Sequence, residues 1–108
     1  MANTFKNYVA SGVGTSASTL LTVASSTQTT VIGITIANVT ASTIKVDVIV
    51  TISASDYYLV KNAVVPVGGA LVPVGGDQKL VLEVGDALKV LSDTSASADV
   101  IVSVLEIT

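Results

Sequence analysis

The sequence predicts an all-β protein: a single-domain antiparallel β-sandwich, jelly-roll-like, with about 8–9 short strands. Three observations predict this fold. Valine, isoleucine and threonine fill 41 of the 108 positions, and these β-branched residues favour strands. Apolar and polar residues alternate with a period of two in several segments. Glycine, proline, serine and aspartate separate these segments, and no window has the spacing of an amphipathic helix, so little or no helix is expected.

The clearest strand covers residues 43–52. Every second residue from Ile44 to Ile52 is Ile or Val, which places these side chains on one face, and Lys45 and Asp47 begin the other face. This pattern is typical of a strand that packs one face against a core.

The preceding segment, residues 29–38, has isoleucine at every second position from Ile32 to Ile36. The short stretch Val39–Ser42 suits a hairpin turn between this strand and residues 43–52. Alternation and turn residues predict the remaining strands at residues 4–13, 18–24, 57–65, 70–74, 79–84, 87–92 and 98–107.

Two features locate the edge and the centre of a sheet. The sequence Val65–Gly69 recurs as Val72–Gly76, and each copy contains a proline, Pro66 and Pro73. Because proline lacks the backbone donor of a β-ladder, these segments are expected at a sheet edge or in a wide loop. The last strand, residues 98–107, is apolar on both faces, so it is expected to be central or to have its second face covered by another subunit.

Composition limits the possible functions. Charged residues make up only 12% of the chain, against about a quarter in typical soluble domains, so we expect part of the surface to be covered by protein in a homo-oligomer or a larger assembly. A net charge of −3 with no arginine argues against nucleic-acid and anionic-membrane surfaces. The mean hydropathy is +0.77, but no apolar run reaches the roughly 18 residues of a membrane helix. No secretory signal is recognisable in Met1–Tyr8.

The chain contains no histidine and no cysteine, which removes the usual catalytic triads, thiol nucleophiles and zinc ligands. We therefore expect no enzymatic activity, no cofactor and no metal site. Five acidic residues of the C-terminal third could suggest a cation site, but their spacing matches no calcium loop, and we expect turn carboxylates. They are Asp77, Glu83, Asp86, Asp93 and Asp99.

The aromatic residues are the best candidates for partner contacts, since they are the only large rigid side chains. Tyr57 and Tyr58 are adjacent on a predicted strand and must point to opposite faces, so at most one of them is in the core. Phe5 and Tyr8 lie in an N-terminal segment, residues 1–8, that could be an arm packed on a neighbour or could complete the sheet of its own subunit. The loops around Pro66 and Pro73 complete the set of predicted contact residues.

Four segments carry a family resemblance: Met1–Asn7, Val31–Asn38, Lys79–Val90 and Asp99–Ile107. In these segments, which span nearly the whole chain, the sequence resembles small virion structural proteins of tailed bacteriophages, notably phages of cyanobacteria and related marine hosts. The resembling motifs are strand and turn segments and carry no catalytic residues. The resemblance implies a virion protein assembled in the host cytoplasm, on the head, the neck or the tail.

The leading hypothesis is therefore a capsid decoration or cement protein, a homo-oligomer with a trimer expected, which binds the major capsid protein or another virion protein on the outside of the shell. An acidic chain suits that outer position better than contact with packaged DNA. The alternative is a neck, tail or fibre component of the same particle. A carbohydrate-binding module is less favoured, because the chain has no tryptophan and few aromatic residues.

Overall fold

The computed structural model describes residues 2–75 and 79–108. In these residues the chain forms nine β-strands and no helix, so none of its described segments is a helix long and apolar enough to cross a membrane. The strands are β1 (Asn3–Val13), β2 (Ser18–Thr22), β3 (Gln28–Asn38), β4 (Ile44–Ile52), β5 (Ser55–Val65), β6 (Ala70–Val74), β7 (Leu80–Leu82), β8 (Ala87–Ser92) and β9 (Ala98–Ile107).

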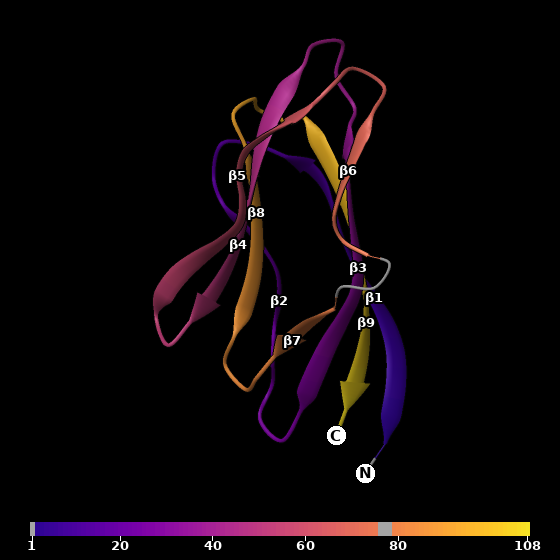
Figure 1. Cartoon of the computed structure of the whole chain (residues 1–108), viewed down its shortest axis with the longest axis vertical. Coiled ribbons are helices and arrows are strands. Elements are labelled where there is room, and N and C mark those ends of the chain that lie inside the picture. Colours follow the sequence, from indigo (N-terminus) through magenta and orange to yellow (C-terminus); the bar gives the residue numbers. More distant parts are fainter. Residues whose placement is uncertain (1, 76–78) are drawn as a thin grey trace.

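The strands form two antiparallel sheets that pack face to face (Figure 1). Sheet A has the order β1-β9-β3-β6, and β7 also pairs with β3. Sheet B has the order β2-β8-β4-β5. The molecule is elongated, with extents of 45 × 27 × 22 Å. The predicted all-β sandwich is confirmed.

The winding of the chain is that of a jelly roll. Apart from the short β7, the strands form nested antiparallel pairs: β1 with β9, β2 with β8, β3 with β6, and β4 with β5. This nesting is what results when one long hairpin is rolled across two sheets. The first and last strands therefore lie side by side, which places the N-terminal segment next to the C-terminal strand.

The core between the sheets is aliphatic. Its largest fully buried side chains include Ile34 and Ile36 of β3, Ile44 of β4, and Leu82 and Leu88 from β7 and β8. No aromatic side chain is fully buried in the described part of the chain. Alternation along the strands supplies this core, because every second residue of a strand points to the same face.

Strand β9 is central in sheet A, between β1 and β3, as one of the two sequence-based alternatives predicted. Val100, Val102 and Val104 point into the core. The opposite face is open, and Ile101 on it is 54% exposed. The proline prediction is also confirmed: Pro73 lies in the edge strand β6, and the Pro66 carbonyl accepts a hydrogen bond from the Gly69 amide (3.0 Å) in the turn after β5.

The predicted hairpin at Val39–Ser42 is wrong. Strands β3 and β4 lie in different sheets, and this stretch carries the chain from one sheet to the other. The Asn38 side-chain amide donates to the carbonyls of Ser42 (2.7 Å) and Val65 (3.0 Å), which holds the crossing in place.

The hairpin is instead formed by β4 and β5. Ser53 and Ala54 connect these strands with φ angles of 52° and 66°, the left-handed geometry that favours a tight two-residue turn. Ile52, predicted to share the buried face of β4, is 41% exposed because it lies at this turn, beyond the end of the core.

Candidate functional site

The predicted contact residues do not form one site. Phe5 and Tyr8 lie on β1, an edge strand of sheet A, whereas Tyr57 and Tyr58 lie on β5, an edge strand of sheet B. Pro66 and Pro73 lie in the connection to β6 and in β6 itself. The structure therefore places these residues in separate parts of the surface.

Residues 3–8 complete the sheet of their own subunit, because β1 pairs with β9 at every position from Asn3 to Ala10. Phe5 points away from the sandwich and is 76% exposed. Tyr8 points to the opposite face, where its hydroxyl donates a hydrogen bond to the Glu106 carboxylate. This hydrogen bond, together with burial and the negative charge of Glu106, raises the pKa of Tyr8 to about 12. The Lys6 ammonium lies 5.3 Å from the centre of the Tyr8 ring.

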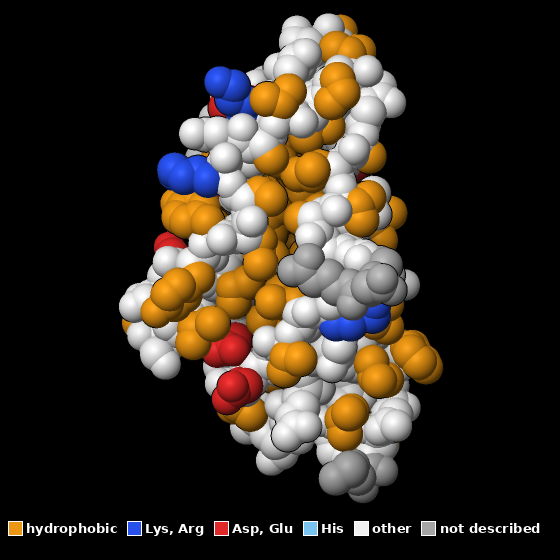
Figure 2. Space-filling model, in the orientation of Figure 1, with side chains coloured by type: hydrophobic (Ala, Val, Ile, Leu, Met, Phe, Trp, Pro, Cys, Tyr) orange, Lys and Arg blue, Asp and Glu red, His pale blue; other side chains and the backbone are white. Residues whose placement is uncertain are grey.

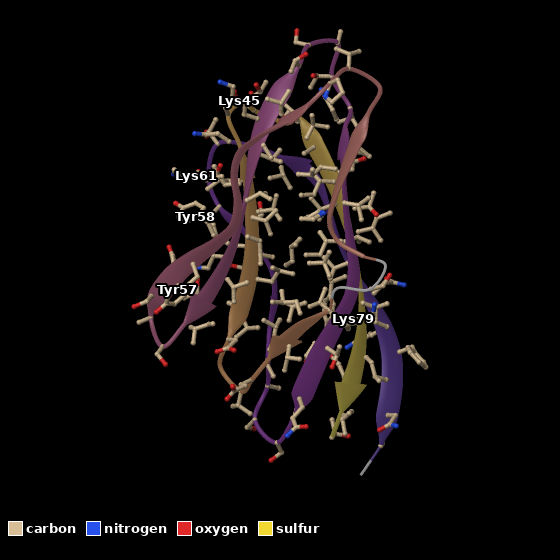
Figure 3. All side chains as sticks on the ribbon, viewed as in Figure 1. Lys45, Tyr57, Tyr58, Lys61 and Lys79 are labelled. Carbon is tan, nitrogen blue, oxygen red and sulfur yellow. The ribbon has the colours of Figure 1, made fainter. Side chains whose placement is uncertain are left out.

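Tyr57 and Tyr58 are both exposed, at 58% and 48%, so neither is a core residue. The Lys61 ammonium lies 4.4 Å above the centre of the Tyr58 ring, a cation–π geometry. Figure 3 shows Tyr57, Tyr58, Lys61 and Lys45 along the same side of the molecule. This side belongs to sheet B and mixes aromatic with charged groups.

The outer face of sheet A differs from that side because its exposed residues are almost all uncharged. One row of paired residues across the sheet runs Phe5, Leu105, Thr30, Val81, and a second runs Val9, Ile101, Thr35. A polar but uncharged row, Asn7, Ser103, Gly33, separates them. We call the five hydrophobic residues of these rows the apolar face: Phe5, Val9, Val81, Ile101 and Leu105.

The only charged residue of β1, β3, β7 or β9 that points out with these rows is Asp99, at one end of the sheet. Its carboxylate accepts a hydrogen bond from the Gly12 amide (3.0 Å). Sheet B is different, because Lys45, Asp47 and Lys89 all lie on its outer face. Figure 2 shows lysine side chains on this β4–β5 side, hydrophobic side chains between the edges of the two sheets, and one further lysine on the sheet A side, where Figure 3 labels Lys79.

A shallow groove of about 490 Å³ lies where β3 meets β7. It is lined by Gln28, Thr29, Thr30, Val81, Leu82, Glu83, Val84 and Ile107. Glu83 is the only titratable residue among them, so the groove lacks the paired acid and base that hydrolytic chemistry needs. The Thr29 hydroxyl is buried beside it without a hydrogen-bond partner.

Three of the five acidic residues singled out from the sequence, Asp86, Asp93 and Asp99, accept backbone hydrogen bonds at turns and strand ends. The Asp86 carboxylate accepts from the Glu83 amide (2.9 Å), and the Asp93 carboxylate accepts from the Lys45 amide (3.1 Å). The hydrogen bond from Lys45 is the main cause that lowers the pKa of Asp93. Asp77 lies outside the described residues, and within them no three His, Cys, Asp or Glu side chains are grouped to hold a metal ion.

The sequence reasoning missed Val9, Val81 and Ile101 as surface residues. The signal was present in the alternation of Phe5, Asn7 and Val9 and in the matching alternation of the last strand. The shared surface can be identified only from the strand register, because the pairing of β1 with β9 places Val9 beside Ile101.

Comparison of the chain with the known protein families, with curated proteins and with solved structures found no match.

Proposed function

We propose that the protein is a non-enzymatic structural component of a bacteriophage virion: a capsid decoration or cement protein that binds the outside of the shell as a homo-oligomer. The observation that carries this proposal is the outer face of sheet A, where the apolar face is exposed and Asp99 is the only charged residue among the outward-pointing residues of β1, β3, β7 and β9. Exposed hydrophobic patches on a protein surface mark sites of interaction with other proteins, among other binding sites.

The distribution of charge supports an orientation. Sheet A would face the shell, because burying its uncharged rows desolvates no ion. Sheet B, with Lys45, Asp47 and Lys89, would face solvent. The net charge of −3 is compatible with that outward position.

The fold supports the proposal only by analogy. Jelly rolls occur in viral capsid domains and also in lectins, so fold alone does not decide between structural and carbohydrate-binding roles. The groove at β7 has no aromatic residue in its lining, whereas sugar sites commonly present aromatic rings. This favours the structural role.

A decoration protein stabilises the shell by mass action. Because it binds the assembled capsid and not the free capsid subunits, its binding free energy adds to the stability of the assembled state. The trimer expected from the sequence is one form that such a protein could take. A ring at the neck or tail is the alternative location.

The copy number of this chain in purified particles tests the proposal. Quantitative mass spectrometry against the major capsid protein should give a simple whole-number ratio between the two proteins. A few copies per particle would instead indicate the neck, tail or fibres, and absence from the particle would overturn the virion role.

A pair of surface variants tests the proposed orientation. Ile101→Glu introduces a charge in the apolar face, and Val64→Glu introduces the same charge at a residue of similar exposure (57%) that pairs with Lys45 in sheet B. We expect Ile101→Glu to lower the amount of protein bound to particles at least about tenfold and Val64→Glu to leave it unchanged. Equal binding of both variants would contradict this orientation.

A further inference from the structure

We propose that two copies of this chain join through the free edge of β1, antiparallel and about a two-fold axis at Asn7, so that sheet A continues from one subunit into the other. The inference rests on the backbone geometry and side-chain pattern of β1. It does not depend on the virion role.

The backbone of β1 presents a row of free hydrogen-bonding groups. The amide and carbonyl of Ala2 both bond to Thr108 (2.9 Å each), so in an antiparallel ladder the groups of Asn3, Phe5, Asn7 and Val9 point the other way. Strand β1 ends sheet A, and no described strand pairs with that outer side. An unpaired edge of this kind is a template for another strand.

The edge is also regular. Residues Asn3–Ala10 pair with β9 at every position, and the register shifts only between Ala10 and Val13. The strands at the other sheet edges are less suitable. Strand β5 has two register shifts against β4, β2 has 5 residues and one shift, β6 contains Pro73, and β7 has 3 residues.

A two-fold axis at Asn7 places apolar residues opposite apolar residues and polar residues opposite polar residues. Phe5 then lies opposite Val9 of the partner subunit, and Asn7 lies opposite Asn7 of the partner subunit. All three positions have outward backbone groups, so each opposed pair exchanges two hydrogen bonds, about six in total. The row Phe5–Leu105 of one subunit also continues into the row of Val9 of the partner subunit, which extends the apolar face across the axis.

The charges favour the same register. Lys6 lies opposite Tyr8 of the partner subunit, whose hydroxyl is bonded to the carboxylate of Glu106 in its own subunit. The Lys6 ammonium would thus lie near an aromatic ring and a carboxylate of the partner subunit. A register centred on Lys6 would instead place two lysines directly opposite each other, which is destabilising. A register centred on Tyr8 would place Asn7 opposite Val9 and mix polar with apolar rows.

The contact has the size of a reversible interface. One strand with its side chains falls at or below the roughly 1,200 Å² of total buried surface that marks the smaller stable complexes. We therefore expect a dimer whose population rises with protein concentration.

Single cysteines test the pairing and its register, since the chain has no cysteine of its own. Opposed residues of a hydrogen-bonded pair lie about 5.5 Å apart at Cα, within the range of a disulfide. Asn7→Cys should therefore form a covalent dimer under mild oxidation. Phe5→Cys and Val9→Cys should each form no covalent dimer alone, because identical residues would lie about 13 Å apart in the paired strands.

A mixture of the Phe5→Cys and Val9→Cys proteins supplies the decisive control, because it should crosslink where neither variant does alone. All three residues are exposed, so these substitutions remove no core contact. Sedimentation velocity of the unsubstituted chain should give a reversible monomer–dimer equilibrium.

Three results would overturn the inference: a monomer at millimolar concentration, a trimer, or self-crosslinking of Phe5→Cys that equals that of Asn7→Cys. None of these results depends on particle binding. A dimer that is absent from virions would contradict only the proposed function, and a virion protein without this pairing would contradict only the inference.

Discussion

Strands β1 and β5 have the same length, 11 residues each, and both end a sheet, yet their edges are built differently. Strand β1 is regular from Asn3 to Ala10. Strand β5 has two register shifts against β4, and Asn62 within it adopts a left-handed φ of 55°. Bulges twist an edge strand and interrupt the row of groups that a second chain would need.

The irregular edge is held by a side chain. The Asp47 carboxylate, nearly buried on β4, accepts a hydrogen bond from the Asn62 amide (2.6 Å) and so satisfies the donor that the bulge removes from the ladder. No comparable side chain caps the outer groups of Asn3, Phe5, Asn7 or Val9 among the described residues. The difference indicates that β5 is protected against strand addition and that β1 is open to it.

Removal of the Asp47 carboxylate should have the largest effect on stability. Asp47→Ala leaves the Asn62 amide without its charged acceptor, and a hydrogen bond to a charged group contributes about 1.5–3 kcal/mol. The free energy of unfolding, measured in urea, should fall by an amount in this range. Asp56→Ala is the matched control on the same hairpin, since the Asp56 carboxylate accepts a hydrogen bond from the Thr51 hydroxyl (2.7 Å) at an exposed site. Equal losses in both variants would contradict the special role of Asp47.

Proline at the centre of β1 should abolish the pairing of subunits and leave the fold intact. Asn7→Pro removes an amide that points away from β9, so the monomer loses no ladder bond and less than about 1 kcal/mol of stability. The dimer dissociation constant should rise more than about tenfold, or about 1.4 kcal/mol. Asn7→Ala keeps the amide and should keep the dimer. Sedimentation equilibrium of the two variants decides between a backbone and a side-chain contact.

The bulge of β5 should tolerate glycine better than a β-branched residue. Asn62→Val forces a branched side chain into the left-handed region and should cost about 1 kcal/mol. Asn62→Gly adopts the same φ without a steric penalty, so its free energy of unfolding should lie within about 0.5 kcal/mol of the parent value. If the Asn62→Val protein were as stable as the Asn62→Gly protein, the left-handed φ of Asn62 would not be required for this edge.

The strands themselves were predictable from sequence, because alternation reports burial directly. Residues 43–52 were assigned from five residues on one face, of which Ile44, Val46, Val48 and Val50 are buried and Ile52, at the turn, is exposed. The sheet to which each strand belongs was not predictable. The stretch Val39–Ser42 has hairpin length, but the Asn38 side chain binds across to Val65 and the chain changes sheets instead. A long-range contact overrode a local turn signal.

The candidate surfaces were predictable only in part, for the same reason. Large rigid side chains identified Phe5, but Val9 and Ile101 became candidates only when the register placed them in one row. The two tyrosines of β5 pair regularly with Ile49 and Val50 and so point to opposite faces, but alternation alone did not reveal that Tyr57 lies near the Ser53–Ala54 turn and is exposed there. Edge geometry depends on pairing, which a single sequence does not specify.

The smallest expected effect concerns the hydrogen bond from the Tyr8 hydroxyl to the Glu106 carboxylate on the β1 side. The pKa of Tyr8 is raised from 10.0 to about 12, so folding favours the neutral phenol. The stabilisation is therefore complete below about pH 10 and is lost as the pH rises through about 12. Because Tyr8 is partly exposed, solvent screening keeps the contribution below about 1 kcal/mol.

Urea unfolding of the monomer across this pH window tests the effect. Tyr8→Phe should lower stability slightly at neutral pH and should flatten the decline between pH 10 and 12. Tyr57→Phe on sheet B should retain the decline of the parent, because Tyr57 is remote from Glu106. If Tyr8→Phe retained the alkaline decline as well, ionisation of Tyr8 would not be its cause. The difference between the edges of β1 and β5 would then depend only on the backbone of β1 and on the Asp47–Asn62 hydrogen bond.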